Sequence, residues 1–488
     1  MGELGAATHS GPLVARAFHR ALAAIFAIAW ASLLWQLEVL IGPRGLLPAA
    51  SYLEAAQRQG IGFAQLPTLF WIDASPAALH AVAWGGLGLS IAALVGMAPR
   101  LCLGLGTLLY LSFTGVARSF LSFQWDNLLL ECGALAVFLP RDRPARWIHV
   151  LFRVLLVKLY VESGIAKWQS GLGDWQDGSA MRWYYETAPL PVWPAWYAHH
   201  LPAWWHGLES RAVLGLELVL PWLAFGPRRA RLLLFAALSG FQLLNLATAN
   251  YGFFVYLALA LHLFLLADTD LARCSRAAGG GPASAAAGLP TRAGRWRRAG
   301  AALVVTVYLG LSINAALLTF MPLPAAVGER LAALHDLEAP WRLVNTYHLF
   351  GSITRERIEP QFEVEQDGIW IPLDLWHKPG DPLRAPDLVA PHQPRVDFQL
   401  WFYGLSFQRG MPEYVGTLLD RLCRDPSAVQ MLFRQPLPAA PEAVRLRFWR
   451  YNFSQPGEED AAGAWWTRRS VAETRPLPCR TPAATGAT

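Results

Sequence analysis

Charged residues and cysteines are both scarce in this sequence, and each scarcity excludes a class of protein. Only 16% of the 488 residues are charged and 54% are hydrophobic, with a mean hydropathy of +0.28. Since soluble domains carry about 25% charged residues, the chain is too apolar for an ordinary soluble enzyme. The five cysteines form no CxxC pair and have no zinc-ligand spacing. We therefore predict no thiolate metal site. We also expect no other metal site and no cofactor.

The motifs of common enzymes are also missing from the sequence. There is no GxSxG, no Walker loop and no GxGxxG after a strand, which are motifs that hold a nucleophile or a nucleotide phosphate. The net charge of +6 could indicate nucleic-acid binding, but the basic residues fall in short blocks between apolar runs. Because a nucleic-acid site needs them along one soluble face, we predict no nucleic-acid partner.

Long apolar runs are abundant. A membrane-crossing helix needs about 20 predominantly apolar residues, and about nine segments approach this length. They are residues 18–41, 77–97, 101–118, 121–140, 147–167, 211–226, 231–247, 251–267 and 300–320. The first segment lacks a clear small-residue cleavage site, so we interpret it as a retained helix. Residues 1–320 are therefore predicted to form a multi-pass α-helical membrane bundle, and the 22 tryptophans agree with several membrane interfaces.

Blocks of arginine between these segments predict an orientation for the bundle. The blocks are Arg16 and Arg20; Arg100; Arg141, Arg143 and Arg146; Arg228, Arg229 and Arg231; and Arg273, Arg276, Arg292, Arg295, Arg297 and Arg298. With nine spans every block falls on the same side, which the positive-inside rule assigns to the cytoplasm. The part that follows the last span is then non-cytoplasmic, whereas an even number of spans would reverse this placement.

The sequence changes character after the last apolar segment. Residues 277–290 are rich in Gly, Ala, Ser and Pro, which predicts a flexible linker inside the membrane part. In residues 361–376, β-favouring side chains flank Asp367-Gly368, a hairpin signal. Residues 413–425 have the periodicity of an amphipathic helix and residues 443–454 alternate like a strand.

These patterns predict a small α+β or β-rich extramembrane domain over residues 321–488. Cys423 and Cys479 are the two cysteines in this region. They could form a disulfide if the domain faces an oxidising compartment.

The apolar segment 147–167 contains unusual charges. They are Arg153, Lys158, Glu162 and Lys167. A charge inside a membrane helix is costly unless it is paired or faces a wet cavity. Lys158 and Glu162 share a helix face, so one hypothesis is an internal ion pair that locks this helix against neighbours such as the segment with Glu217. The other makes Lys158, Glu162 or Lys167 a functional acid or base, because a desolvated lysine loses its proton easily.

Two further groups could suggest chemistry. Asp126 and Glu131 are five residues apart and do not share a helix face closely, so a helix cap or loop anchor is the favoured role of Asp126 over a paired-carboxylate site. His199, His200 and His206 lie in an aromatic-rich loop. A metal site there would need a further ligand, so interfacial packing is favoured.

Four stretches together resemble the lipase maturation factor family. They are residues 120–133, residues 173–202, residues 243–254, and residues 344–359 followed by 378–402. The second contains Trp175 and Asp177 and then Tyr-x-Glu-Thr-x-Pro-Leu-Pro. The stretches span most of the chain in the family's order. The linker at 277–290 departs from the family pattern.

The resemblance implies a membrane-bound maturation or folding factor. In animals such a protein is a multi-pass resident of the endoplasmic reticulum membrane that helps secreted dimeric lipases reach their assembled state. The family's lumenal C-terminal region is associated with client binding. The short Ala/Arg/Pro-rich chain looks bacterial, which implies the bacterial inner membrane. The expected partners are membrane lipid and a secreted client protein, by resemblance a lipase.

The resemblance also names the residues of the family motifs, which are candidates for client contact. They are Trp175, Asp177, Tyr185, Glu186, Thr187, Asn345, Thr346, Phe350, Gly351, Ser352, Thr354, Arg355, Pro391, Gln393, Pro394, Arg395 and Asp397. From the residues alone, Gly351 and the nearby prolines indicate fixed turns. Arg355, Arg357, Arg395 and Asp397 could form a charge network that holds these turns together. A scaffold and a client-contact surface are both compatible with this pattern.

A membrane enzyme is the alternative function. Residues 161–181 also resemble a segment of the horizontally transferred transmembrane domain group, which includes vitamin-K-dependent gamma-carboxylase. In that group a lysine in the position of Lys167 is associated with base catalysis. A transporter is less favoured, because no inverted repeat or pair of broken helices is evident.

Overall fold

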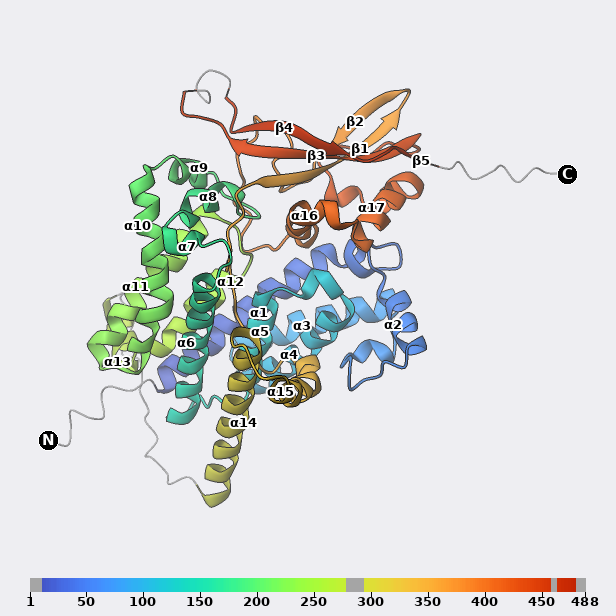
Figure 1. The fold of residues 1–488 in the computed structure, drawn as a ribbon. Coiled ribbons are helices and arrows are strands. Elements are labelled where there is room, and N and C mark those ends of the chain that lie inside the picture. The colour runs from blue at the N-terminus through green and yellow to red at the C-terminus, as the bar shows by residue number, and fades with distance from the viewer. Residues whose placement is uncertain (1–10, 278–293, 458–462, 480–488) are drawn as a thin grey trace.

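Helices make up most of the fold, and a small β-sheet lies over one end of them (Figure 1). The computed structural model describes residues 11–277, 294–457 and 463–479. The helices before the sheet are α1 (Pro12–Ile41), α2 (Ala49–Arg58), α3 (Pro76–Leu94), α4 (Pro99–Val116), α5 (Gln124–Ala136), α6 (Arg146–Trp168), α7 (Asp174–Asp177), α8 (Ala180–Thr187), α9 (Pro194–His199), α10 (Ala203–Leu214), α11 (Arg228–Thr248), α12 (Phe254–His262), α13 (Asp268–Ala277), α14 (Arg295–Phe320) and α15 (Ala325–Glu338). The predicted linker at 277–290 lies almost wholly outside the described residues.

Four of the described helices, α1, α3, α11 and α14, are long and apolar enough to cross a membrane. The predicted number of about nine spans is not confirmed, although each predicted segment coincides with helical structure. Helix α5 has 13 residues and so extends about 20 Å, less than the hydrocarbon core of about 30 Å. The segment 211–226 is broken, because α10 gives way to a π-helical turn (Gly215–Val219) and then a 3-10 helix that contains Pro221.

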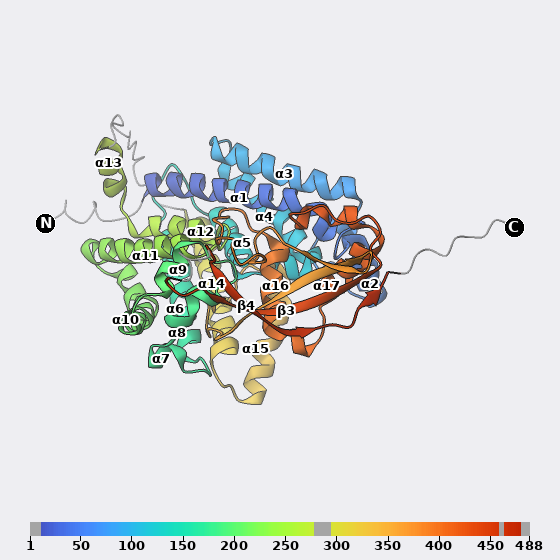
Figure 2. The same ribbon diagram turned by 90° about the horizontal axis from the view of Figure 1, so that it is seen from above.

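Helix α1 packs against α3, α4, α5 and α12. It runs beside α3 (Figure 2). Trp30 of α1 packs against Gly86 of α3, where a Cβ atom would lie 2.2 Å from the indole ring. Further along α1, Ser32 and Gln36 are buried polar side chains. Because buried polar groups need hydrogen-bond partners, these two residues require polar neighbours from another part of the chain.

The sheet is antiparallel and has the strand order β2-β1-β3-β4, with β5 paired to β3. The strands are β1 (Arg357–Gln366), β2 (Ile369–Leu373), β3 (Ala443–Phe453), β4 (Trp466–Glu473) and β5 (Leu477–Pro478). The predicted hairpin and the predicted strand at 443–454 are confirmed. Asp367 and Gly368 both have positive φ, +52° and +71°, which is the backbone of the tight turn that suits a right-twisted hairpin.

Two helices lie between the sheet and the helical part (Figure 1). They are α16 (Arg395–Ser406) and α17 (Glu413–Arg424), and α17 confirms the predicted amphipathic helix. Cys423 of α17 and Cys479, which follows β5, form a disulfide in the structure. The bond links α17 to the segment after β5, and a cross-link of this kind stabilises the fold mainly by restricting the unfolded chain.

Helix α16 crosses β1 at Gly404, which gives a direct test of this packing. A Cβ atom at Gly404 would lie 2.0 Å from the carbonyl oxygen of Ile358 in β1. We expect Gly404→Ala to lower the free energy of unfolding by about 1–3 kcal/mol, because the helix would have to move away from the sheet.

Gly416→Ala on α17 is the matched control, because the nearest atom to its Cβ would be the Met411 sulfur at 3.8 Å. Alanine also favours helix over glycine, so this variant should be neutral or more stable. Thermal unfolding of the two purified variants measures the difference. An equal loss in both would contradict the α16–β1 contact.

Candidate functional site

The helical part and the C-terminal domain meet in a buried polar interface, which we call the junction. It comprises the contacts between helices α1–α14 and residues 342–479. Charged side chains lie in it almost without exposure, among them Asp126 (0%), Glu131 (0%) and Arg395 (1%). Because an unpaired buried charge is strongly unfavourable, the partners of these groups determine how the two parts fit together.

Asp126 in the first turn of α5 binds Arg395 at the start of α16. The two guanidinium Nη atoms donate to its carboxylate oxygens at 2.6 and 2.9 Å. Tyr110 of α4 donates to the same carboxylate at 2.7 Å, and Arg395 also donates to the carbonyl of Phe120 at 3.0 Å. A two-point arginine–carboxylate contact fixes orientation as well as distance, so α16 is aligned on α4 and α5.

Glu131 accepts hydrogen bonds from three parts of the chain at once. Lys158 of α6 and Tyr308 of α14 donate to its Oε1 at 3.0 and 2.8 Å. The Asn345 backbone N–H and the Tyr347 hydroxyl donate to its Oε2 at 3.1 and 2.7 Å. This carboxylate therefore joins two helices to the segment that leads into the sheet.

The expected pair between Lys158 and Glu162 is replaced by separate contacts. Lys158 binds Glu131, while Glu162 accepts a hydrogen bond at 2.8 Å from the backbone N–H of Tyr347. A pair of residues four apart on one helix stabilises it only weakly, by about 0.2–0.5 kcal/mol, and here α5 and the segment after α15 supply the partners instead. Lys158 therefore forms an internal ion pair, as one hypothesis predicted, but its partner is Glu131 on the neighbouring helix α5.

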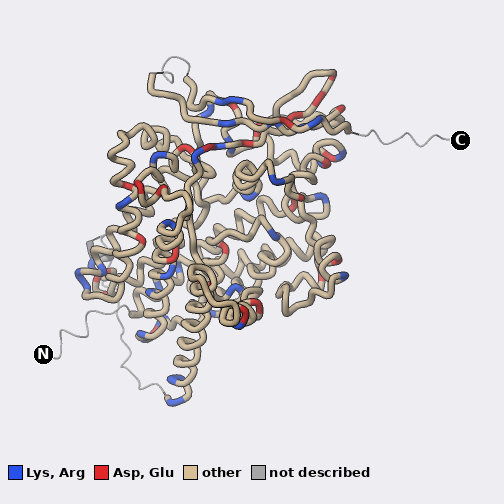
Figure 3. The backbone as a smooth tube through the Cα atoms, in the orientation of Figure 1, with Lys and Arg blue, Asp and Glu red and all other residues tan. Residues whose placement is uncertain are grey.

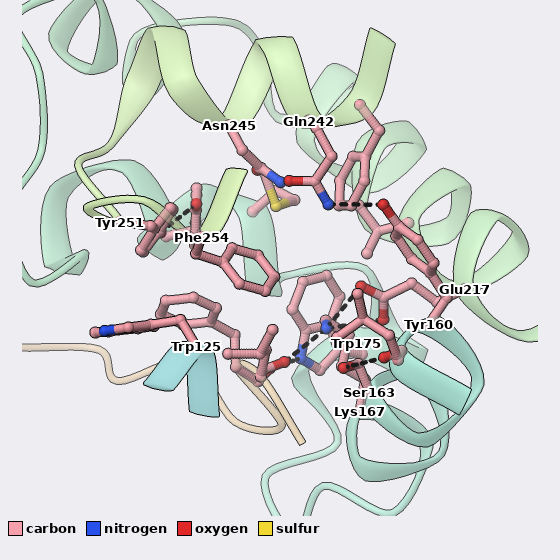
Figure 4. A pocket seen from close by; sticks show the side chains of 17 residues that line it. Trp125, Tyr160, Ser163, Lys167, Trp175, Glu217, Gln242, Asn245, Tyr251 and Phe254 are labelled. Atoms are coloured by element: carbon pink, nitrogen blue, oxygen red, sulfur yellow. Dashed lines mark hydrogen bonds and ion pairs between the residues drawn. The ribbon is translucent and has the colours of Figure 1, made fainter. Parts of the chain in front are cut away.

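Lys167 at the end of α6 is paired with Glu217, at 2.8 Å, and donates to the carbonyl of Leu349 at 2.7 Å (Figure 4). Glu217 lies in the π-helical turn after α10 and is buried. The lysine nitrogen also lies 5.2 Å from the centre of the Trp175 ring, a favourable cation–π distance. Protein groups thus surround the ammonium group.

A small cavity adjoins this pair (Figure 4). Its volume is about 60 Å³, and Tyr160, Gln242 and Tyr251 contribute to its wall. Ligand pockets usually have volumes of about 300–1,000 Å³, so this cavity has room for a few water molecules and not for a substrate. The geometry gives no support to Lys167 as a catalytic base.

The motif around residues 174–187 reaches the C-terminal domain at three points. Asp174 accepts from the N–H of Ile353 at 2.8 Å, and the Trp175 indole donates to the carbonyl of Phe350 at 3.2 Å. Glu186 accepts from Phe453 N–H at 2.7 Å and from the Asn452 side chain at 2.8 Å. Burial raises the pKa of the Glu186 carboxyl, and these two hydrogen bonds act in the opposite direction.

Arg357, the first residue of β1, is held by the end of the same motif. Its buried guanidinium donates to the carbonyls of Glu186 and Ala188 and, at 3.0 Å, to that of Pro189. Glu359 pairs with Arg357 at 2.6 Å. The strand therefore starts at a point fixed by the loop after α8.

The segment 391–397 binds the polar residues of α1. Ser32 accepts from Gln393 N–H at 3.1 Å. Gln36 donates to the Gln393 carbonyl at 2.9 Å and accepts from Arg395 N–H at 2.8 Å. Sequence reasoning missed Ser32, Gln36 and Tyr110, whose signal was a polar side chain within an apolar helix.

The predicted charge network among Arg355, Arg357, Arg395 and Asp397 is wrong. Arg395 binds Asp126 and Arg357 binds carbonyl groups, as described above, while Asp397 accepts a hydrogen bond from His377 N–H at 3.0 Å. Burial raises the pKa of Asp397, and His377 lowers it. Arg395 has its partner 269 residues away in α5, while Arg357 binds backbone carbonyls at the end of α8 and after it, together with Glu359 on its own strand. The distant partners cannot be predicted from local sequence.

Most of the family-motif candidates are buried. These are Trp175, Tyr185, Glu186, Thr187, Asn345, Gln393, Pro394, Arg395 and Asp397. Thr346, Phe350, Gly351, Thr354 and Pro391 are half-buried, and Asp177, Ser352 and Arg355 are exposed. The three candidate histidines lie close together: the ring centres of His199 and His200 are 5.0 Å apart, and Nε2 of His206 lies 3.2 Å from the His199 carbonyl oxygen. His200 also contacts the Trp196 carbonyl, His206 contacts Glu209 and His199 contacts Phe453, and burial lowers the pKa of His199 to about 4. Within the described ranges no group of three His, Cys, Asp or Glu residues could hold a metal ion.

Comparison with known proteins identifies the family. A family model described as the lipase maturation factor transmembrane domain matches residues 13–273, and one described as the lipase maturation factor C-terminal domain matches residues 343–476. The chain belongs to the lipase maturation factor family. With its apolar helices it is a membrane protein, and the resemblance drawn from its motifs is confirmed.

Its relatives in this family are similar over most of their length. Lipase maturation factor 1 of Bos taurus is 32% identical over 93% of this chain and 86% of the relative. Lipase maturation factor 1 of Homo sapiens is 29% identical over 93% and 85%, and lipase maturation factor 2 of Homo sapiens is 30% identical over 94% and 82%. No solved structure matches the chain.

The junction of this lipase maturation factor family member can be tested at Arg395. Arg395→Met leaves the Asp126 carboxylate buried without its cation, and we expect a loss of about 3–5 kcal/mol in the free energy of unfolding. In Asp126→Asn with Arg395→Met neither charge is buried, so the double variant should regain a large part of that loss. Thermal unfolding in detergent measures the stability of the unmodified protein, the single variant and the double variant.

Arg434→Met is the control, because Arg434 forms a partly exposed pair with Asp387 at 2.9 Å. An exposed pair contributes at most about 1 kcal/mol. Equal losses for Arg434→Met and Arg395→Met would show that the buried pair does not hold the junction.

Proposed function

We propose that this chain is a membrane-bound maturation factor that helps secreted lipases reach their folded state. The observation that carries the proposal is the match to both lipase maturation factor models, in order, with similarity to named lipase maturation factors over 93% of the chain. The buried family motifs support it, since they form the junction that joins the helices to the C-terminal domain.

We also propose that the protein is multi-pass and that residues 321–488 lie on the non-cytoplasmic side. Helix α6 begins at Arg146, and its last turn touches Leu349 of the C-terminal part. Basic residues gather at the lower end of α14, away from the sheet (Figure 3). The positive-inside rule then puts the arginine-rich ends in the cytoplasm. That arrangement places the sheet in the lumen of the endoplasmic reticulum for an animal relative, and outside the inner membrane for a bacterial chain.

The client contact, in this proposal, is the exposed rim of the family motifs, which consists of Asp177, Ser352 and Arg355. The buried motif residues cannot touch a client while the junction is closed, so they act as a scaffold. Ser352 lies beside Ser170, with 3.2 Å between the two hydroxyl oxygens, and Arg355 lowers the pKa of Asp177, after the larger effect of hydrogen bonds from Ser179. The rim is thus a compact polar surface next to the junction.

Client capture tests the rim. We expect Asp177→Ala with Arg355→Ala to reduce the amount of lipase crosslinked to the purified protein by at least about fivefold, since each lost hot-spot contact costs about 1 kcal/mol or more. Mass spectrometry of the crosslinked products identifies the client and the peptides in contact. Thermal stability should stay unchanged, because both side chains are exposed.

Arg469→Ala is the control for charge removal, because Arg469 is exposed on β4 of the same domain. It should leave client capture intact. Undiminished crosslinking in the rim variant would rule out the rim as the contact surface, and the absence of any crosslinked lipase would count against the maturation function itself.

The enzyme alternative is tested at Lys167. Lys167→Met should destabilise the protein by about 3–5 kcal/mol because Glu217 is left buried without a cation. Lys167→Met with Glu217→Gln removes both charges, so stability and secreted lipase activity should recover together. If the double variant is stable and captures its client but yields no active lipase, Lys167 has a chemical role and the scaffold account of this pair fails.

A further inference from the structure

A second cavity lies at the arginine-rich ends of the helices, away from the junction. Its volume is about 700 Å³. Five arginines line it, and they come from three separate segments: Arg100 from the start of α4, Arg143 and Arg146 from the start of α6 and the loop before it, and Arg297 and Arg298 from the start of α14. The fold therefore concentrates positive charge that is dispersed in the sequence.

The described wall of this cavity is basic and apolar. None of the described residues that line it is acidic. Asp142, the acidic residue nearest to it in the sequence, is exposed and is not part of the lining. The backbone carbonyl of Val137 accepts a hydrogen bond at 2.6 Å from Nε of Arg100, which restrains this lining side chain. Guanidinium groups arranged in this way are suited to phosphate oxygens.

The remainder of the wall is apolar and follows a membrane helix. Leu303 and Val304 belong to α14, which is long and apolar enough to cross a membrane. Phe138 and Trp147, whose ring centres are 6.2 Å apart, also line the cavity. A free phosphate ion would contact only the arginines and would leave the apolar part of the wall unused. A lining that combines arginines with apolar side chains fits a molecule with an anionic head and a hydrocarbon tail.

We propose that this cavity binds an anionic phospholipid, with its headgroup phosphate on the arginines and an acyl chain along Leu303 and Val304. A zwitterionic lipid is disfavoured, because no carboxylate in the lining is available for its ammonium group. The bound lipid joins the starts of α4, α6 and α14 and offsets the mutual repulsion of the arginines. This site goes beyond the maturation function and lies at the opposite end of α6 from the junction.

The test uses the purified full-length chain in a neutral detergent, with lipid binding followed by native mass spectrometry. The probes are dioleoylphosphatidylglycerol, dioleoylphosphatidylcholine and glycerol 3-phosphate. We expect phosphatidylglycerol to bind at least about tenfold more tightly than phosphatidylcholine, and to raise the melting temperature. Equal affinity for the two lipids would overturn the proposal. Glycerol 3-phosphate that binds as tightly as phosphatidylglycerol would also overturn it, since the site would then be one for soluble anions.

Variants locate the site. Arg143→Gln, Arg146→Gln and Arg297→Gln combined should reduce the affinity for phosphatidylglycerol at least about tenfold. The matched control combines Arg58→Gln, Arg330→Gln and Arg409→Gln, three exposed arginines outside the cavity, and should change it by less than about twofold. Equal effects of the two triple variants would contradict the assignment.

A photoactivatable phosphatidylglycerol provides a second measurement that needs no variant. In the unmodified protein we expect adducts within residues 138–147 or 297–304. Adducts that are confined to other segments would refute the site even if the triple arginine variant does not fold.

Discussion

The requirement that buried charges be paired governs this fold. The helices contain carboxylates that have no exposure, and the groups that neutralise them come partly from the C-terminal domain. Asp126 is the clearest case, because its cation, Arg395, lies 269 residues away in the sequence. Glu131 shows the same dependence, with donors from two helices and from residues 345 and 347. Neither part satisfies its buried polar groups alone, so the junction makes them a single structure.

Local patterns in the sequence predicted local structure well. The Asp367-Gly368 turn, the amphipathic helix α17 and the alternating strand β3 all follow from short-range periodicity and turn chemistry. The partners of the buried charges could not be predicted in this way, because Lys158 reaches Glu131 on another helix instead of Glu162 one turn away. The number of about nine spans is not confirmed, since four of the described helices are long and apolar enough to cross a membrane. An apolar run indicates burial, and α5 shows that a buried helix can be too short to cross a membrane.

The structure gives the family motifs a physical meaning. Residues such as Trp175, Glu186, Asn345 and Arg395 are buried and bind across the junction, which accounts for their occurrence in both the helical part and the C-terminal part of the sequence. Within this picture the proposed client surface is small, and the interior pair of Lys167 and Glu217 is a structural contact beside a cavity of about 60 Å³. The family's function, as proposed for this chain, then depends on a rigid platform that presents the exposed rim.

Hydrogen–deuterium exchange of the full-length protein in detergent tests the central claim most directly. The backbone N–H groups of Asn345, Tyr347 and Ile353 donate to Glu131, Glu162 and Asp174. If the junction holds the two parts together, peptides covering residues 344–354 will exchange as slowly as those of α5, although the segment contains no helix or strand. Exchange as fast as that of the exposed turn at Asp367-Gly368 would contradict the account.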